Sequence, residues 1–344
     1  MQKISFIILI CLLLIPVGCQ RKKEAVGREV VVTVVADPEV YKQVAPALSA
    51  ALERIIRTPW PEQHFELVQL PPEQLSKIAV RPSIIMIGLL DKNDKTSKQV
   101  RAMLPEGMDE QVRAGKSFVF RREDPWAKNQ ILLVLAGTNA DSLIGQIGAN
   151  EDYLFNVLRR NLLKRTKNQM FSELEQKDIA EDLLEKYGWQ VRVQHDYHLW
   201  KEYAHDNFVM LRRTAPERWF FVKWIESTDP SIITREWVLK QRYNIGQKYY
   251  EKDTIPDTMM TTREVDFNGR WALELQGLWE NNEKLAGGPY KSYTFYDEEM
   301  QRIYMLDMAV FAPGRSKEEL IRQLEVMART FQTKSDIEKQ KKEH

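Results

Sequence analysis

Three histidines that lie close together in the sequence form the first group that could do chemistry. His195, His198 and His205 fall within eleven residues, with acidic residues beside them. Imidazole is a common zinc ligand, and a neighbouring carboxylate can complete a site or orient a ring. If the segment is a strand, however, His195 and His198 point to opposite faces. We therefore expect these histidines to lie in a solvated loop, and we predict no metal and no other cofactor.

Carboxylates in the C-terminal part are candidates for hydrolytic chemistry. A glycosidase needs two of them at a defined separation, which a sequence does not provide. Asp307 is the most unusual because it interrupts an apolar run, although a carboxylate in such a position more often pairs with an arginine on a sheet face. The sequence contains no Gly-x-Ser-x-Gly, His-Glu-x-x-His or Ser-x-x-Lys motif. The five candidates are Glu264, Asp266, Glu274, Glu280 and Asp307.

Aromatic residues in the same region are candidates for ligand binding. Large flat rings can line a groove for a glycan or a peptide. The same residue types also pack on the half-buried face of a sheet and form cross-strand pairs, which is their more frequent role. The group comprises Trp271, Trp279, Tyr290, Tyr293 and Tyr296, and we select the first four as candidate ligand-binding residues.

The N-terminus carries an export and anchoring signal. Lys3 is followed by an apolar run, 4–17, that is too short to span a bilayer comfortably. The run leads to Gly18-Cys19 and then to polar residues. This pattern resembles a bacterial lipobox, in which the cysteine becomes the lipidated N-terminus. Pro16 departs from the pattern, where leucine is favoured. An ordinary signal peptide or a single-pass anchor is the alternative.

Lipidation at Cys19 would define the start of the mature protein. Residues 1–18 would be a cleaved signal peptide and residues 19–28 a tether. Cleavage would remove Cys11, the other cysteine of the sequence, so that the mature protein could form no internal disulfide. We therefore expect a cell-envelope protein. Its lipid anchor is expected to lie in the outer membrane, with the protein on the periplasmic or the surface side.

The composition excludes several classes of protein. Of 344 residues, 29% are charged and 43% are hydrophobic, which is typical of a globular protein and excludes a disordered or multi-span membrane protein. The formal net charge of +1 gives no support for nucleic-acid binding, which calls for a basic excess. A chain of this length has room for two domains.

The N-terminal half has the pattern of an α/β layer. The β-branched run at 29–36 predicts a buried strand, and Asp37-Pro38 predicts the start of a helix that extends to about residue 57. The other elements expected here are strands at 65–70, 82–90, 117–122 and 130–136, and a mobile loop with a helical turn or two at 91–115. A helical connector is expected at 140–187, broken at Gly145 and Gly148 and again at Lys167-Asn168, in a domain placed at 29–187.

The C-terminal half is organised around the densest β signal in the chain, 266–313. Large apolar residues recur at alternate positions between residues 271 and 279, which predicts a strand with one buried face. Turn residues at 287–289 and 297–299 predict a three-strand antiparallel meander, closed by the helix that follows. The other elements expected are strands at 189–193, 207–213 and 219–225, helices at 229–252 and 317–331, and a charged frayed tail at 334–344, with the domain placed at 188–333.

Four blocks of the sequence resemble a family of uncharacterised bacterial envelope lipoproteins, a domain of unknown function that is common in the Bacteroidota. The resemblance implies lipidation and an envelope location, and it supplies no catalytic residues. The histidine-rich segment before Asn207 departs from the family. The meander and its closing helix, whose last residues are 324–331, look like the end of PsbP-like domains. These domains are αβα sandwiches used mostly for binding, and the likeness concerns architecture alone. The four blocks are 124–130, 207–213, 267–279 and 287–293, the last continuing through 311–313.

The anchoring signal, the neutral charge and the aromatic-rich strands favour a two-domain α/β envelope lipoprotein that acts as a non-enzymatic binding or assembly module. Its expected partners are the membrane, through the lipid anchor, and an envelope protein or glycan; nucleic acid is not expected. The alternative is an envelope hydrolase that acts on peptidoglycan or polysaccharide. Converging histidines, or a carboxylate of strongly raised pKa in a cleft, would favour that alternative.

Overall fold

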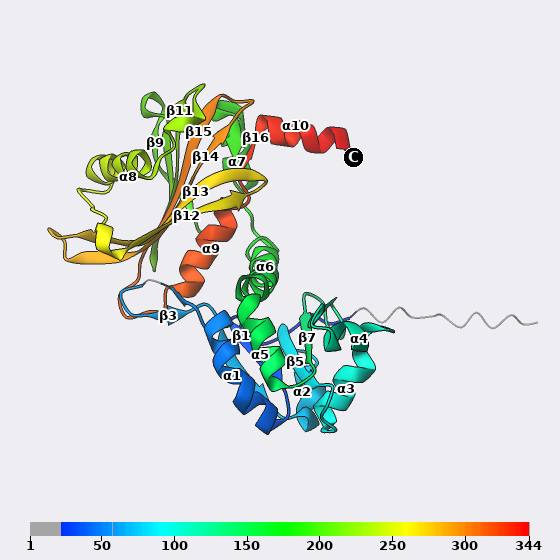
Figure 1. Ribbon diagram of the computed structural model, residues 1–344. Helices are drawn as coiled ribbons and strands as arrows, with labels where there is room; N and C mark the ends of the chain where they lie inside the picture. Colours follow the sequence, from blue (N-terminus) through cyan, green and yellow to red (C-terminus); the bar gives the residue numbers. More distant parts are fainter. Residues whose placement is uncertain (1–21, 57, 344) are drawn as a thin grey trace, which may run out of the picture.

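The computed structural model describes residues 22–56 and 58–343, so that Cys19 and the predicted signal peptide lie outside the described residues. This part of the chain forms two main sheets, a five-stranded sheet in the N-terminal half and a seven-stranded sheet in the C-terminal half. Helices lie on both faces of each sheet (Figure 1). The predicted α/β class, with an antiparallel meander in the C-terminal half, is confirmed.

The five-stranded sheet contains the strands expected in the N-terminal half. Its order is β4-β1-β5-β7-β6, parallel except for the edge strand β6. All residues of β5 and β7 are buried, because helices cover both faces, and this explains their continuous apolar sequences. The strands are β1 (Val31–Val35), β4 (Glu66–Leu70), β5 (Ser83–Leu89), β6 (Val119–Glu123) and β7 (Ile131–Gly137), with a small hairpin of β2 (Ile55–Ile56) and β3 (Glu62–Gln63).

Helices sandwich this sheet. One face is covered by α1, α5 and α6, which share a core with it, and the other by α2, α3 and α4. The side chain of Asp37 accepts hydrogen bonds from the backbone N–H groups of Glu39 and Val40 and starts α1 as expected. The bounds are α1 (Pro38–Leu52), η1 (Pro72–Gln74), α2 (Leu75–Ile78), α3 (Lys95–Met103), α4 (Met108–Arg113), α5 (Ala140–Ala149) and α6 (Glu151–Met170).

The segment 91–115, predicted as a mobile loop with a helical turn or two, forms the two helices α3 and α4 and is thus more helical than expected. Asp94 caps α3 by accepting a hydrogen bond from the backbone N–H of Ser97 at 2.8 Å. The helix buries Thr96 and Ser97 beside Val100. Small polar residues on the buried face weaken the hydrophobic periodicity, and the sequence pattern therefore does not reveal the helix.

The helical connector is divided at other places than expected. Gly145 and Gly148 lie inside α5, and Lys167-Asn168 lies inside α6; the breaks fall at Asn150 and Phe171. The next helix, α7 (Lys177–Tyr187), ends at Gly188, whose φ of 79° is the left-handed conformation that glycine adopts readily at a helix end.

The seven-stranded sheet has the order β12-β13-β14-β15-β11-β10-β9, and all its neighbouring strands are antiparallel. The meander has four consecutive strands rather than three, because β12 also pairs with β13. The strands are β9 (His198–Tyr203), β10 (Phe208–Arg213), β11 (Glu217–Glu226), β12 (Met260–Phe267), β13 (Arg270–Asn281), β14 (Ala286–Asp297) and β15 (Arg302–Phe311). Short elements beside them are β8 (Trp189–Gln190) paired with β16 (Gln332–Thr333), η2 (Ala204–Asp206), η3 (Pro230–Ile232) and η4 (Asp257–Met259).

The turn predicted at 287–289 is wrong. These residues lie within β14 and pair with residues 278–280 of β13. A Cβ at Gly288 would lie 1.9 Å from the carbonyl oxygen of Val310 and 3.2 Å from Nε1 of Trp279. The glycine is therefore needed for close packing against the tryptophan and the neighbouring strand, a role that sequence alone does not distinguish from a turn.

Helices cover both faces of the seven-stranded sheet. The core on one side contains residues of α8 (Arg235–Tyr249), and the core on the other side contains residues of α7 and α9 (Glu318–Ala328) (Figure 1). Leu273 therefore packs on the α8 side of β13, while Ala272 packs on the α9 side. The prediction of one buried face for this strand is wrong, because helices cover both faces of the sheet. Trp271, at the start of the strand, is 49% exposed.

The segment after residue 333 forms a helix, α10 (Lys334–Glu343), where a frayed tail was expected. The carboxylate of Asp336 accepts hydrogen bonds from the backbone N–H of Thr333 at 2.9 Å and from Arg270 at 2.6 Å. These contacts tie the first turn of α10 to the sheet, while the rest of the helix extends away from it (Figure 1).

The two halves of the chain meet where α6 lies against α9 (Figure 1). Glu62, in the small hairpin, accepts hydrogen bonds from the backbone N–H groups of Lys317 and Glu318, each at 2.9 Å. A side chain of one half thus stabilises the N-terminus of a helix in the other. The division into domains at 29–187 and 188–333 stays a prediction.

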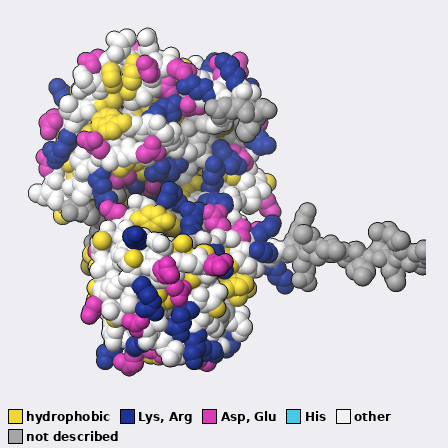
Figure 2. Space-filling view, turned by 45° about the vertical axis from the view of Figure 1, so that its right-hand side comes forward, with side chains coloured by type: hydrophobic (Ala, Val, Ile, Leu, Met, Phe, Trp, Pro, Cys, Tyr) yellow, Lys and Arg dark blue, Asp and Glu magenta, His cyan; other side chains and the backbone are white. Residues whose placement is uncertain are grey.

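Charged side chains of both signs are interspersed on the visible face of the molecule (Figure 2), in keeping with a formal net charge of +1. Within residues 22–56 and 58–343, no helix combines the length and the apolar character needed to cross a membrane.

Candidate functional site

A cavity of about 220 Å³, which we call the aromatic pocket, lies at one end of the seven-stranded sheet on the side of α8. Its lining residues come from the edge strand β9, from β13 and the strands between them, and from the end of α8 and the residues that follow it. Aromatic side chains predominate in its lining. The lining residues are Trp200, Arg212, Glu217, Trp219, Tyr249, Tyr250, Glu251, Asp253, Trp279, Asn281, Lys284, Ala286 and Phe311.

Three tryptophans from three different strands line the aromatic pocket. Trp219 of β11 and Trp279 of β13 meet edge to face, with ring centroids 5.9 Å apart and an interplanar angle of 84°. Trp279 is buried, and its Nε1 donates to the carbonyl oxygen of Val310 at 3.3 Å, which fixes the ring. Trp200 of β9 also lines the pocket and is 37% exposed.

Trp200 occupies an irregularity in the edge strand. Its two neighbours pair with consecutive residues of β10, so that Trp200 is the extra residue of a β-bulge. Bulges re-aim a side chain and are common at sheet edges and beside active sites. Here the bulge brings the ring against Arg212, whose guanidinium carbon lies 4.2 Å from the ring centroid.

The long charged side chains of the pocket are paired with one another. Arg212 donates to both carboxylate oxygens of Glu217, through Nε at 2.8 Å and through Nη2 at 2.5 Å. Lys284 forms an ion pair with Glu251. Because these charges cancel locally, the pocket favours an uncharged ligand.

Asp253 and Asn281 supply hydrogen-bonding groups beside the rings. Nδ2 of Asn281 donates to Oδ1 of Asp253 at 2.7 Å. Burial raises the pKa of Asp253 above its ordinary value, against the effect of this hydrogen bond. No hydrogen bond within residues 22–56 and 58–343 engages Oδ2 of Asp253, so this oxygen is available to a ligand hydroxyl or amide.

The size and composition of the pocket define what it can hold. Pockets for drug-sized ligands occupy roughly 300–1,000 Å³ and combine apolar or aromatic walls with a few polar groups. The aromatic pocket has that composition at a smaller volume, about 220 Å³. It therefore fits a single ring or one side chain of a larger molecule.

The four aromatic residues selected from the sequence do not converge on one site. Trp279 lines the aromatic pocket, whereas Trp271 lies near the opposite end of β13 and donates through Nε1 to Glu264 at 3.0 Å. Tyr290 and Tyr293 are fully buried, the first in the core on the α8 side and the second in the core on the α9 side. A ligand-binding role for these four residues stays a prediction.

The five candidate carboxylates lie in different surroundings. Asp307 bonds to Arg242 of α8 at 2.7 Å, which confirms the expected pairing with an arginine. Burial raises the pKa of Asp307 to about 6 despite that partner. Glu274 bonds to Lys291 at 2.9 Å, in the network on the α9 side of the sheet. The other three, Glu264, Asp266 and Glu280, are exposed or half-buried along β12 and β13.

The three histidines do not converge either. All three are exposed, and His198 begins the edge strand β9 where a loop was expected. Nε2 of His205 lies 3.3 Å from Oδ2 of Asp206. In the part of the chain that the structure describes, no group of three or more His, Cys, Asp or Glu side chains is arranged to hold a metal ion.

Both halves of the chain match family models without a known function. Residues 176–330 match the domain of unknown function DUF4837, and residues 25–171 match the domain of unknown function DUF8532; each match covers less than half of the chain. These matches support membership of an uncharacterised family. No curated protein matches the chain.

Solved structures show only weak similarity. A protein from Bacteroides thetaiotaomicron matches with 9% identity and a TM-score of 0.26, over 43% of this chain and 46% of that chain, so the match spans about half of that protein. LpqN, involved in cell envelope biogenesis of Mycobacterium tuberculosis, matches with 13% identity and a TM-score of 0.30, over 42% and 81%. A mutant of the protein Mog1 matches with 13% identity and a TM-score of 0.29, over 42% and 90%. Similarity at this level supports no assignment of function.

Proposed function

We propose that this chain is a lipid-anchored protein of the cell envelope that binds an uncharged saccharide ring in the aromatic pocket without catalysing a reaction. The observation that supports this most is the convergence of Trp200, Trp219 and Trp279 beside polar groups in a pocket whose long charged side chains are paired. Indole rings offer flat apolar surfaces to the C–H face of a sugar, and a carboxyl or amide group can bond its hydroxyls.

The arrangement of carboxylates favours binding over hydrolysis. A glycosidase needs two carboxyl groups that flank the scissile bond, one as acid and one as base or nucleophile. Glu217 and Glu251 are held by Arg212 and Lys284. Among the described residues that line the pocket, Asp253 is left as the carboxyl without a cationic partner. The envelope hydrolase is therefore the less supported alternative.

Replacing Trp200 with Ala is expected to weaken saccharide binding at least tenfold, because stacking is lost from the most exposed ring of the pocket. Thermal stability should change little, since the residue lies in an edge strand and is 37% exposed. The measurement is a titration of the intrinsic tryptophan fluorescence with neutral oligosaccharides released from bacterial envelopes, together with a thermal melt.

Trp60→Ala is the matched control for that titration. Trp60 is 77% exposed and does not line the aromatic pocket, so its replacement should leave affinity unchanged. Equal loss in both variants would contradict a site at Trp200. Binding of hydrophobic peptides in place of saccharides would replace the proposed ligand class with a peptide.

Replacing Cys19 with Ser is expected to abolish incorporation of labelled palmitate into the protein and to release it from the membrane, because the thiol is the proposed site of lipidation. Cys11→Ser is the control, since residue 11 would be removed with the signal peptide. Incorporation that persists in the Cys19 variant, or that is lost in the Cys11 variant, would refute lipidation at Cys19. Anchoring by more than one acyl chain would be stable, at about 0.8 kcal/mol for each buried methylene.

A further inference from the structure

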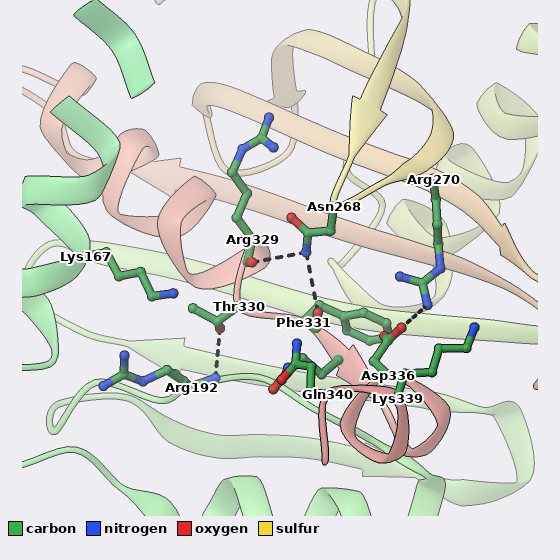
Figure 3. A pocket seen from close by; sticks show the side chains of 11 residues that line it. Lys167, Arg192, Asn268, Arg270, Arg329, Thr330, Phe331, Asp336, Lys339 and Gln340 are labelled. Carbon is green, nitrogen blue, oxygen red and sulfur yellow. Dashed lines mark hydrogen bonds and ion pairs between the residues drawn. The ribbon is translucent and has the colours of Figure 1, made fainter. Parts of the chain in front are cut away.

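A second cavity, which we call the basic pocket, lies on the α9 side of the seven-stranded sheet and shares no lining residue with the aromatic pocket. Its volume is about 470 Å³. Figure 3 shows that its walls come from the end of α6, the segment after β8, the turn between β12 and β13, and the region from the end of α9 to α10. Five cationic side chains and one carboxylate line it: Lys167, Arg192, Arg270, Arg329, Lys339 and Asp336.

The arginines are held in place by groups behind them. Arg192 donates through Nε and Nη2 to Glu175, at 2.7 Å and 2.6 Å, and packs over a phenylalanine ring. Arg270 donates through Nη2 to Asp297 and Asp336, each at 2.6 Å. A guanidinium has five N–H donors, and no hydrogen bond within residues 22–56 and 58–343 engages Nη1 of Arg192 or Arg270. These groups are positioned by the fold and retain donors for a ligand.

The backbone carbonyls at the end of α9 would repel an anion if they were unpaired. Asn268, with a left-handed φ of 54°, lies against them. Its Nδ2 donates to the carbonyl oxygens of Arg329 at 3.1 Å and Phe331 at 3.4 Å (Figure 3). Oγ1 of Thr330 accepts a hydrogen bond from the backbone N–H of Arg192 at 2.9 Å. Two carbonyl oxygens and one hydroxyl oxygen of this wall thus accept hydrogen bonds from protein groups, which reduces the repulsion of an anion there.

We propose that the basic pocket binds a phosphate group carried on a larger molecule. Lys167 and Arg192 lie near each other on one side of the pocket, and Arg270 and Lys339 lie on the other (Figure 3). A phosphate has three acceptor oxygens and a charge of about −1.5 to −2, so that it can use several donors from different elements, whereas one carboxylate is satisfied by a single guanidinium. The carboxylates that pair with Arg192 and Lys339, Glu175 and Glu299, do not line the pocket.

A neighbouring cavity of about 380 Å³ offers room for the rest of the ligand. It shares Arg270 and Lys339 with the basic pocket and is lined by the rings of Trp271 and Tyr296. Its acidic residues, including Glu298, disfavour a second anionic group there. The uncharged part of the molecule therefore extends over Trp271, which gives this half-exposed tryptophan a surface role.

The test is a calorimetric titration of residues 20–344 with inorganic phosphate, glucose 1-phosphate, or vesicles of phosphatidic acid and phosphatidylcholine, with pure phosphatidylcholine vesicles as reference. Citrate, an anion without phosphate, is titrated for comparison. This part of the chain contains every core cluster of the described residues, from Val32 to Phe331, and omits Cys19, so that a lipid anchor cannot cause vesicle binding. Lys167→Gln and Lys339→Gln should each weaken binding about tenfold. Lys164→Gln in α6 and Lys341→Gln in α10, which do not line the pocket, should leave it unchanged.

Each outcome decides the proposal. Binding of glucose 1-phosphate or inorganic phosphate that depends on Lys167 and Lys339 supports a soluble phosphorylated ligand. Binding of phosphatidic acid vesicles alone, if it depends on the same two lysines, supports a lipid headgroup as the source of the phosphate. The proposal is overturned if no probe binds, if binding does not depend on Lys167 and Lys339, if the control variants lose as much affinity as the pocket variants, or if citrate, titrated for comparison, binds more tightly than phosphate.

Discussion

Replacing Glu325 with Gln is expected to lower the free energy of unfolding by about 3–5 kcal/mol. Glu325 lies in α9, is 3% exposed and bonds to Arg159 of α6. It also accepts hydrogen bonds from Lys291 at 3.2 Å and from the hydroxyl of Tyr293 at 3.1 Å. Lys291 keeps Glu274 as a partner in the variant. Arg159 is left without an ion-pair partner among the described residues, and an uncompensated buried charge is costly.

The pH dependence gives this prediction a second test. Burial alone would raise the pKa of Glu325, but Arg159, Lys291 and Arg329 hold it well below the ordinary carboxyl value. The folded-state pKa therefore lies below the unfolded value of about 4.3. The negative charge of Glu325 therefore stabilises the folded protein fully at a pH above the unfolded pKa. This stabilisation is lost as the pH falls through the folded-state pKa. The difference between the wild type and the variant should be steady from neutral pH to about pH 5 and then shrink.

Urea denaturation followed by tryptophan fluorescence measures both effects. Glu319→Gln is the control, because Glu319 lies in the same helix and is exposed; its replacement should change stability by no more than about 0.5 kcal/mol. A Glu325 variant as stable as the control would show that the network does not tie α6 to α9. A difference that does not shrink in acid would show that the lost charge is not its cause.

Replacing Trp279 with Ala is expected to cost about 3–5 kcal/mol of stability, the usual range for removing a large buried aromatic side chain. Trp279 is 4% exposed, and its ring lies close to those of Trp219 and Phe311, with centroids 5.9 Å and 6.2 Å away. Gly288, over which it packs, has no side chain that could fill the space. The variant also loses the hydrogen bond from Nε1 to Val310.

Trp271→Ala is the matched comparison, because both tryptophans lie on the same face of β13. Trp271 is 49% exposed, and its removal should cost no more than about 1 kcal/mol. Chemical denaturation of the two variants compares them directly. Equal losses would contradict the different burial of the two rings, and a stable Trp279 variant would mean that the neighbouring side chains collapse into the cavity.

Local patterns predicted most of the elements that build the cores. The strands β1, β5 and β7 follow from β-branched or continuous apolar runs, which are typical of strands covered on both faces. The start of α1 follows from Asp37, which can cap only a helix that begins directly after it. Segments with polar buried residues were missed. The helix α3 buries Thr96 and Ser97, and α10 is held by a contact between Asp336 and Arg270 from another part of the chain.

The candidate site was only partly predictable for a related reason. Trp279 was selected because aromatic residues are dense in its strand. Trp200 was not selected, because the bulge that aims it arises from pairing between β9 and β10. Asp253 and Asn281 come together only because the residues after α8 lie beside the end of β13, with the backbones of Thr254 and Glu280 hydrogen-bonded at 2.8 Å. No sequence spacing encodes that contact.

The sequence by itself determined the α/β class, the positions of the central strands and the signal that predicts a lipid anchor, because each depends on residues that are neighbours in the chain. Only the tertiary structure decided which aromatic residues are core and which face a pocket, because strands of alternating sequence can be covered on one face or on both. The tertiary structure also determined which charged side chains line the basic pocket. Lys167, Arg192 and Arg270 are far apart in the sequence and meet through the packing of α6, α9 and the β12–β13 turn.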